Sequence, residues 1–283
     1  MSPASASGAL VLAATPLGDP RDASPRLREL IGTADVIAAE DTRRFRTLAA
    51  ALEVTYVGKV VSHYDAVEVD RLPGLLDAVR DGGTVLVVSD AGMPAVSDPG
   101  YRLVAAAAAE GLPVTCAPGP SAVTTALVLS GLPCERFCFE GFPPRRPGER
   151  RRRLAELSDE RRAVVFFESP RRTADLLADA VAVLGPDRRA AVCRELTKTH
   201  EQVVRGTLAE LADWARSGDV LGEVTVVLAG AAPRTAPPVE SLVDAVRERT
   251  DDGERLKDAV AAVAEATGVP KRDLYNATLA ARD

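Results

Sequence analysis

Short apolar runs alternate with segments of helical length along the first part of the chain. The runs are rich in Val, Leu, Ile and Ala and occupy residues 10–13, 36–39, 84–89 and 114–117. We expect the helices between them to begin near Ser24, Asp98 and Ser121, where capping residues or prolines stand. This alternation of strand and helix predicts βα units around a mostly parallel sheet.

The second part of the chain shows a different pattern. Strand-like runs at 136–139, 163–167, 190–194, 202–205 and 223–229 lie close together, and helices are expected at 149–157, 173–184 and 208–217. Strands separated by so few residues favour antiparallel pairs, so this half should form a mixed sheet. The predicted fold class is therefore α/β, with two α/β domains at residues 8–118 and 119–231.

A Pro- and Ala-rich stretch at 231–238 is typical of a linker. Beyond it, residues 239–283 carry three short amphipathic helices, at 242–249, 255–266 and 271–279. A turn containing glycine followed by a final helix is the layout of a helix-turn-helix module. A plain helical cap on the body is the alternative.

The composition indicates a globular protein. The 283 residues are 46% apolar and 27% charged, which is enough to bury a sizeable core. No apolar run approaches the roughly 20 residues of a membrane span, and residues 1–7 lack the features of a signal peptide, so we expect a cytoplasmic protein without a membrane partner. The four cysteines lack zinc-ligand spacing, and we expect them to be buried thiols rather than metal ligands.

The charge is acidic overall but arginines are clustered. A formal net charge of −6 argues against a general electrostatic grip on nucleic acid. Arginine clusters at 43–44, 145–146, 150–153, 161–162 and 171–172 could still form a local basic strip. Ordinary solvated surface arginines are the alternative.

Three loops of small residues, at 15–20, 89–100 and 117–121, follow successive strands of the first half. Because the carboxyl ends of parallel strands and the following helix starts converge, these loops predict a ligand crevice. Helix starts after Asp98 and Ser121 favour an anionic group on the ligand. Asp90 could hold a ribose hydroxyl or a cation, whereas Asp98 is expected to cap its helix. The crevice lacks the fingerprints of dinucleotide and triphosphate sites.

Two strands of the second half end in charged loops, at 166–172 and 193–200. Both strands should deliver these charges to the same sheet edge, where they are candidates for holding a nucleophile near a cofactor. Only two histidines exist, and no Ser-His-Asp or Cys-His arrangement is indicated. His63 is expected to be a packed or surface residue rather than a base.

Seven motifs occur in order along the chain: ATPLGD at 14–19, AEDTR at 39–43, VSDAGMP at 88–94, SDPG at 97–100, PGPSA at 118–122, FEGF at 139–142 and RELTK at 194–198. As a set they resemble the signature blocks of the bacterial 16S rRNA (cytidine-2′-O)-methyltransferases, the rRNA branch of the tetrapyrrole (corrin/porphyrin) methylase superfamily. Two departures are Met93, where a threonine is common, and an alanine-rich tail.

The resemblance implies S-adenosylmethionine bound in a non-Rossmann cleft between two α/β domains. It also implies methyl transfer to a ribose 2′-hydroxyl of a decoding-centre cytidine in 16S rRNA of the small ribosomal subunit, by a homodimer. Carried over by position, the cofactor-binding residues are Pro16, Gly18, Asp90, Gly92, Met93, Pro94, Ser121, Ala122, Phe167, Arg194 and Gly230.

For catalysis, we expect Glu168 or Asp98 to accept or orient the hydroxyl proton and Lys198 to stabilise developing negative charge. The RNA-contact candidates are Arg43, Arg44, Arg145, Arg146, Arg171, Arg172, Lys271 and Arg272. Two other classes stay open from the residues: a small-molecule tetrapyrrole methylase, and a non-catalytic ribosome-assembly factor that binds RNA without cofactor.

Overall fold

The predicted strands of the first part are all present and pair in parallel. The computed structural model describes residues 8–232 and 237–281, so residues 1–7, part of the linker at 231–238 and the last two residues of the tail lie outside the described residues. The chain divides into two compact units, one ending at Ala231 and one starting at Ala232. The boundary expected near residue 118 falls between two sheets of the first unit.

The first sheet has the strand order β3-β2-β4-β1-β5 and every pair in it is parallel. Its strands are β1 (Ala9–Ala13), β2 (Val36–Ala39), β3 (Lys59–Ser62), β4 (Thr84–Val88) and β5 (Val114–Ala117). The sequence pattern did not reveal β3, because an edge strand of four residues with only partly buried side chains carries a weak apolar signal.

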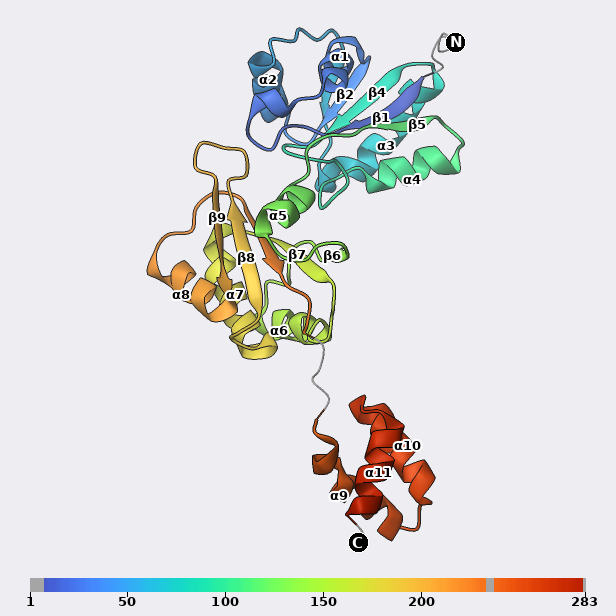
Figure 1. Ribbon diagram of the computed structural model, residues 1–283. Coiled ribbons are helices and arrows are strands. Elements are labelled where there is room, and N and C mark those ends of the chain that lie inside the picture. The colour runs from blue at the N-terminus through green and yellow to red at the C-terminus, as the bar shows by residue number, and fades with distance from the viewer. Residues whose placement is uncertain (1–7, 233–236, 282–283) are drawn as a thin grey trace. The chain divides into compact units, whose positions relative to one another are not determined.

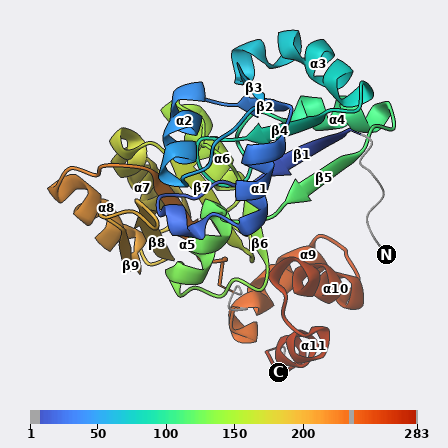
Figure 2. The same ribbon diagram turned by 90° about the horizontal axis from the view of Figure 1, so that it is seen from above.

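Helices cover both faces of this sheet (Figures 1 and 2). They are α1 (Pro25–Thr33), α2 (Thr42–Ala51), α3 (Asp65–Arg80) and α4 (Tyr101–Ala109). Since successive side chains of a strand point to opposite faces, Val11 and Ala13 pack with α1 and α2, whereas Leu10 and Leu12 pack with α3 and α4. Burial on both faces explains why these strands are nearly continuous apolar runs.

The second sheet is mixed, as predicted. Its order is β6-β7-β10-β8-β9, with β6 parallel to β7 and every other pair antiparallel. The strands are β6 (Phe137–Phe139), β7 (Ala163–Glu168), β8 (Arg189–Arg194), β9 (Gln202–Thr207) and β10 (Val224–Leu228).

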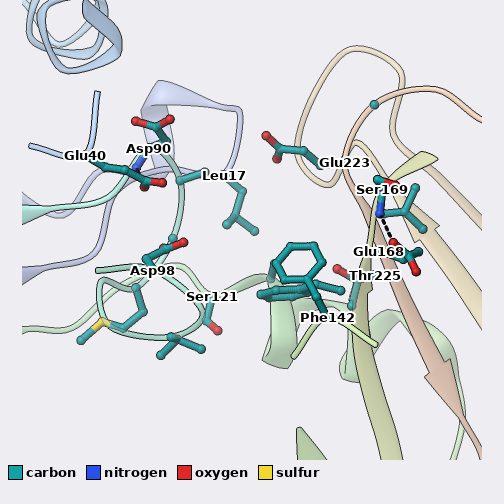
Figure 3. Close-up of a pocket in the computed structure, with 18 of the residues that line it drawn as sticks. Leu17, Glu40, Asp90, Asp98, Ser121, Phe142, Glu168, Ser169, Glu223 and Thr225 are labelled. Atoms are coloured by element: carbon teal, nitrogen blue, oxygen red, sulfur yellow. Dashed lines mark hydrogen bonds between the residues drawn. The ribbon is translucent and has the colours of Figure 1, made fainter. Parts of the chain in front are cut away.

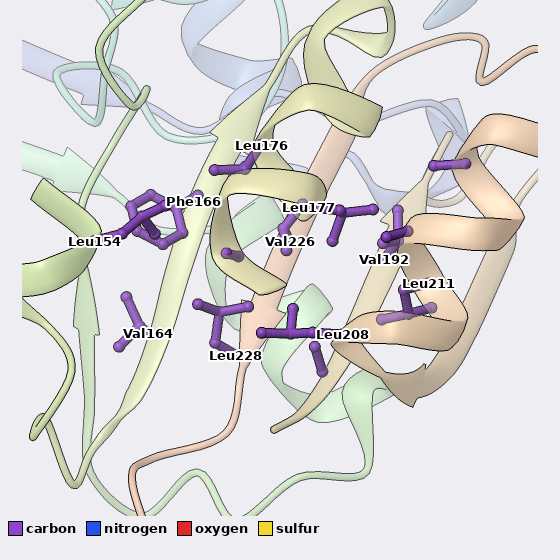
Figure 4. Packing of buried hydrophobic residues seen from close by; sticks show 14 of the residues in the cluster. Leu154, Val164, Phe166, Leu176, Leu177, Val192, Leu208, Leu211, Val226 and Leu228 are labelled. Carbon is purple, nitrogen blue, oxygen red and sulfur yellow. The ribbon is translucent and has the colours of Figure 1, made fainter. Parts of the chain in front are cut away.

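One face of the second sheet carries α6 (Pro147–Glu156), α7 (Pro170–Leu184) and α8 (Leu208–Ser217), and the other face packs against α5 (Ala122–Ser130). Phe166 and Val226 point from neighbouring strands into the leucines of α6 to α8 (Figure 4). Burying an apolar side chain of this size contributes ~1.5–3 kcal/mol, so this cluster is a main source of stability.

Strand direction decides which residues meet at the edge of this sheet. Val224, the first residue of β10, lies opposite both Glu168 at the end of β7 and Arg194 at the end of β8. The two charged loops therefore do leave the same edge, as expected. Gly230 follows the other end of β10, where a Cβ would lie 1.9 Å from the carbonyl oxygen of Arg161.

The second unit is helical. A short 3₁₀ helix (Val239–Leu242) precedes α9 (Val243–Asp251), α10 (Leu256–Thr267) and α11 (Lys271–Ala280), and a second 3₁₀ helix lies in the first unit at Pro20–Asp22. Val246, Val260 and Leu274 form its core, one from each helix. Gly268 ends α10 with a φ of 76°, a left-handed value that glycine adopts without strain, and so turns the chain into α11. Three helices with this turn confirm the helical tail.

Two smaller expectations have mixed outcomes. Cys193 is buried, but Cys116, Cys134 and Cys138 are only partly buried, so the prediction of four buried thiols was wrong for three. Within residues 8–232 and 237–281, no helix is both long enough and apolar enough to cross a bilayer.

Candidate functional site

A pocket of about 340 Å³ opens in the first unit, where the loops after β1, β4 and β5 face the ends of β7 and β10. Cofactor pockets in proteins begin at about this size. The residues drawn in Figure 3 line it from two sides, with Asp90 and Asp98 on one side and Glu168, Glu223 and Thr225 on the other.

Carboxylates dominate the first side. Glu40 Oε2 accepts a hydrogen bond of 3.0 Å from the Asp90 backbone N–H, and Asp90 Oδ1 accepts one of 3.1 Å from Asp41 N–H. Burial raises the pKa of both Glu40 and Asp90, and their proximity to each other raises the pKa of Glu40 further. Arg44 is the basic residue among those that line the pocket, and its Nε lies 3.4 Å from Asp90 Oδ2. This side therefore favours positive charge on a ligand.

Asp98 lies in the same wall and does not cap a helix, so that prediction was wrong. Helix α4 starts at Tyr101, and its N-cap is Gly100, which has a φ of 130°. Asp98 lies two residues before this N-cap. Glu68 instead accepts a hydrogen bond of 3.0 Å from Gly100 N–H, so a carboxylate of the protein, not a ligand anion, lies at this helix start. Burial, followed by repulsion from Glu40, raises the pKa of Asp98 to about 7.

The loop that carries Asp90 and Asp98 has an unusual backbone. Gly92 has a φ of 83°, and Ala95 and Ser97 each have a φ of 66°, in the left-handed region that costs non-glycine residues free energy. Gly92 exchanges backbone hydrogen bonds with Thr15 of the first loop, at 2.9 and 3.1 Å. Strained residues of this kind gather at binding sites because the surrounding structure holds them.

On the other side, Glu168 is engaged by its neighbours. Its side chain is fully buried, Oε1 accepts a 2.7 Å hydrogen bond from Ser169 N–H, and Oε2 forms a 2.7 Å ion pair with Arg172. Phe167 and Phe142 add aromatic surface beside it. With both oxygens occupied, Glu168 is suited to holding Arg172 and the start of α7 in place rather than to accepting a proton.

Lys198 does not itself line the pocket, but it forms an ion pair with Glu223, which does. Its Nζ lies 3.1 Å from Glu223 Oε2 and 2.9 Å from Glu195 Oε1, while Arg44 Nη1 lies 3.9 Å from the other oxygen of Glu223. Burial disfavours its charge, but these carboxylates leave the pKa of Lys198 above its usual value. A Cβ on Gly18 would lie 2.2 Å from Lys198 Cγ, so a glycine is needed for this close packing.

The structure brings together eight of the fourteen predicted catalytic and cofactor-binding residues, and one RNA-contact candidate, Arg44, joins them. Those that line the pocket are Arg44, Asp90, Gly92, Met93, Asp98, Ser121, Ala122, Phe167 and Glu168. Pro16 and Gly18 flank the lining residue Leu17, and Pro94 follows Met93. Arg194 lies near the same edge but bonds to Gln202 and the Leu221 carbonyl. Gly230 lies at the opposite edge, because β10 runs antiparallel to β7 and presents its first residues to the pocket.

Sequence reasoning did not single out Glu223 or Phe142. Glu223 directly precedes an apolar strand, a signal that becomes useful only once the direction of that strand is known. Phe142 belongs to the FEGF motif, but an aromatic residue in a loop is by itself as consistent with core packing as with a site.

The arginine candidates differ in their surroundings. Arg43 forms an ion pair with Asp41 at 2.9 Å, and Arg172 is held by Glu168. Arg145, Arg146 and Arg171 are exposed. In the second unit, Lys271 and Arg272 are exposed at the start of α11.

Comparison with known proteins identifies relatives over the whole chain. A sequence profile described as Tetrapyrrole (Corrin/Porphyrin) Methylases matches residues 9–212, and one described as RsmI C-terminal HTH domain matches residues 236–282. A Mycobacterium bovis protein named ribosomal RNA small subunit methyltransferase I is 62% identical over 277 residues, which are 98% of this chain and 96% of that protein.

Solved structures show a similar fold. A cobalamin biosynthetic enzyme, cobalt precorrin-4 methyltransferase, has a TM-score of 0.59 at 19% identity and covers 78% of this chain and 94% of its own. Uroporphyrin-III C-methyltransferase from Thermus thermophilus, solved in complex with S-adenyl homocysteine, has a TM-score of 0.55 at 19% identity, covering 78% and 96%. At this identity the likeness concerns the fold alone.

Proposed function

Because the chain belongs to the tetrapyrrole (corrin/porphyrin) methylase family, and within it groups with the ribosomal RNA small subunit methyltransferase I proteins, we propose that it methylates 16S rRNA with S-adenosylmethionine as donor. The acceptor we propose is the ribose 2′-hydroxyl of a decoding-centre cytidine. The observation that carries the proposal is the 62% identity over 98% of the chain to a protein of that name, which includes the helical tail.

The pocket lining fits S-adenosylmethionine, which supplies an electrophilic methyl group on a positively charged sulfonium. Glu40, Asp90 and Asp98 form an acidic wall suited to positive charge. Gly92 lines the pocket and has no side chain, so a ligand can approach its backbone closely, and its φ of 83° is one that glycine adopts without strain. Phe167 offers an aromatic face for a flat ring.

Asp98 is the residue we assign to the proton of the ribose hydroxyl. A general base works best when its pKa lies near the operating pH, and burial together with Glu40 brings the pKa of Asp98 to about 7. Glu168 orients Arg172 and the loop at the start of α7, for both of its oxygens are already bonded. Lys198 acts through Glu223, whose carboxylate it holds at the pocket together with Arg44.

The acceptor reaches the site past exposed arginines. Arg145 and Arg146 precede α6, and Arg171 lies in the first turn of α7 next to the lining residue Pro170. Guanidinium groups bind phosphate oxygens, and a few well-placed contacts suffice where a folded RNA surface supplies the remaining interactions. Lys271 and Arg272 of the second unit are further candidates for RNA contact.

The test uses small ribosomal subunits from a strain that lacks the gene. Incubation with labelled S-adenosylmethionine should place one ribose methyl group on a cytidine of 16S rRNA, located by mass spectrometry of nuclease fragments. Methylated subunits from the parent strain serve as the control and should accept no label. Labelling of a porphyrin precursor in place of the subunits would favour the tetrapyrrole alternative, and calorimetry without donor binding would favour the assembly factor.

Charge reversal tests the basic strip. Arg145→Glu together with Arg146→Glu should weaken binding to small subunits and flatten its dependence on salt concentration, because each lost phosphate contact lowers the slope by about one. Arg189→Glu is the matched control, since Arg189 is exposed at the start of β8, the end of that strand away from the pocket edge. Equal losses in both variants would contradict the assignment.

We also expect a homodimer located in the cytoplasm. Light scattering on the purified protein should return twice the mass of one chain, and fractionation of cells should recover the protein with ribosomal subunits in the soluble fraction.

A further inference from the structure

We propose that Phe142 is the stacking surface for the base of the nucleotide whose ribose is methylated. The inference rests on the proposed function and adds the residue that positions the acceptor. It starts from exposure: the Phe142 side chain is 59% exposed, yet it lines the pocket beside Phe167 and Glu168. Single exposed apolar side chains are common on protein surfaces, so the inference needs more than exposure.

The second observation is that neighbouring aromatic rings hold the Phe142 ring in place. Phe139, Phe167 and Phe142 form a row of edge-to-face contacts, with ring centroids 4.8 Å apart for the first pair and 5.8 Å for the second. Edge-to-face geometry is favourable for aromatic pairs and leaves one face of the last ring available. In Figure 3 the Phe142 ring lies between the acidic side of the pocket and Thr225.

The backbone is fixed on both sides of the ring. The Gly141 carbonyl accepts a 3.0 Å hydrogen bond from Phe167 N–H, and the Pro143 carbonyl accepts one of 3.0 Å from Arg172 Nη2. Gly141 has a φ of 64°, which lets the chain turn out of β6 directly before Phe142. A rigid exposed aromatic loses little conformational entropy when a ligand covers it, so it is preorganised for binding.

Charge next to the ring indicates what covers it. Arg145 and Arg146 follow within four residues and are exposed, and exposed Arg171 is adjacent to the lining residue Pro170. Within the part of the chain that the structure describes, Arg145 and Arg171 form no ion pair. An aromatic face flanked by free guanidinium groups is the combination that binds unpaired nucleotides, with the ring under the base and the cations on the phosphates.

The geometry of the pocket favours such a contact. Ribose 2′-hydroxyls are exposed in the shallow minor groove of a paired helix, but here the acceptor oxygen has to enter a pocket of about 340 Å³. A nucleotide that leaves its stack to reach this pocket needs a new partner for its base. A base stacked on Phe142 has its sugar at the pocket, beside the wall that carries Asp98. Phe142 is thus a positioning residue for the acceptor and not part of the donor site.

The experiment compares Phe142→Ala, Phe142→Tyr and Phe137→Ala. Phe137 is the matched control, because it is 42% exposed on edge strand β6 and does not line the pocket. Removing one stacked base typically weakens binding roughly 5- to 150-fold. We therefore expect Phe142→Ala to raise the KM for unmethylated small subunits by at least fivefold, Phe142→Tyr to restore it, and Phe137→Ala to leave it unchanged.

The KM for subunits, calorimetry with the donor and thermal unfolding together decide the outcome. Calorimetry should give the same affinity of Phe142→Ala and the wild-type protein for S-adenosylmethionine, and thermal unfolding should give the same midpoint. A weakened donor affinity, an unchanged KM for subunits, or an equal effect of Phe137→Ala would each overturn the inference. If the wild-type protein itself fails to methylate small subunits, the proposed function fails, which is a separate result from failure of the Phe142 variants.

Discussion

Replacing Asp98 with asparagine should stabilise the protein without ligand at pH 8 and leave it unchanged near pH 4. Burial and the nearby Glu40 carboxylate raise the pKa of Asp98 from its ordinary value of 3.8 to about 7 in the folded state. Between pH 3.8 and about pH 7, Asp98 holds a proton in the folded state that it has released in the unfolded state. The free energy of unfolding therefore falls as pH rises through this window and levels above pH 7.

The size of the effect follows from the shift. One pKa unit corresponds to 1.36 kcal/mol, so a shift of about three units sets an upper bound of ~4 kcal/mol. Asp98 is only partly buried, and solvent screens part of its interaction with Glu40. We therefore expect Asp98→Asn to stabilise the protein by ~1–3 kcal/mol at pH 8.

The assay is urea denaturation of wild-type and variant proteins at pH 5, 6, 7 and 8, in the absence of donor. The unfolding free energy of Asp98→Asn minus that of the wild-type protein should grow from pH 5 to pH 8. Asp70→Asn is the matched control, because Asp70 is an exposed carboxylate on α3, and its difference should stay flat with pH. A pH-independent difference for Asp98→Asn, or one that shrinks toward pH 8, would refute the assignment of a raised pKa.

The same carboxylate links donor binding to pH. A cation bound against the acidic wall stabilises the ionised form of Asp98, so binding near pH 7 should release part of a proton. Calorimetry in two buffers of different ionisation enthalpy measures this release, which Asp98→Asn should abolish. Proton release that persists in the variant would assign the linkage to another group.

Two further predictions concern a buried ion pair between α6 and α7 and the packing beside the site. Asp179→Ala should destabilise the protein by ~3–5 kcal/mol in urea denaturation, because it leaves the Arg150 guanidinium, 3% exposed and 2.7 Å from Asp179, without its buried partner; a loss under 1 kcal/mol would contradict this. Gly18→Ala should weaken donor affinity at least tenfold in calorimetry, since its Cβ would displace Lys198, whereas Gly74→Ala, with open space around it, should bind donor normally.

Much of the fold could be predicted because its signals are local. Short apolar runs separated by capped helices led to a parallel sheet followed by a mixed one, and both are present. The ordered motifs also pointed to Asp90, Gly92 and Ser121 as neighbours, and all three line the same pocket. Loops that follow parallel strands must emerge at one edge, so chain order alone brings them together.

The remaining part of the site depends on contacts between distant segments. Whether Glu168 is free or bonded depends on Arg172 one helical turn away and on the fold of its loop, and the exposure of Phe142 depends on how β6 pairs with β7. Gly230 was expected at the pocket because its strand ends there in sequence, but the antiparallel direction of β10 carries it to the opposite edge.

The sequence by itself determined most of the strands and helices and their order along the chain, the family motifs and the gathering of the first three loops, since these follow from local apolar runs and strand connectivity. Only the tertiary structure decided that Asp98 belongs to the pocket wall instead of a helix cap, and that its pKa lies near 7. The physical reason is that burial and charge–charge repulsion depend on distances between segments such as Glu40 and Asp98, which no local pattern encodes.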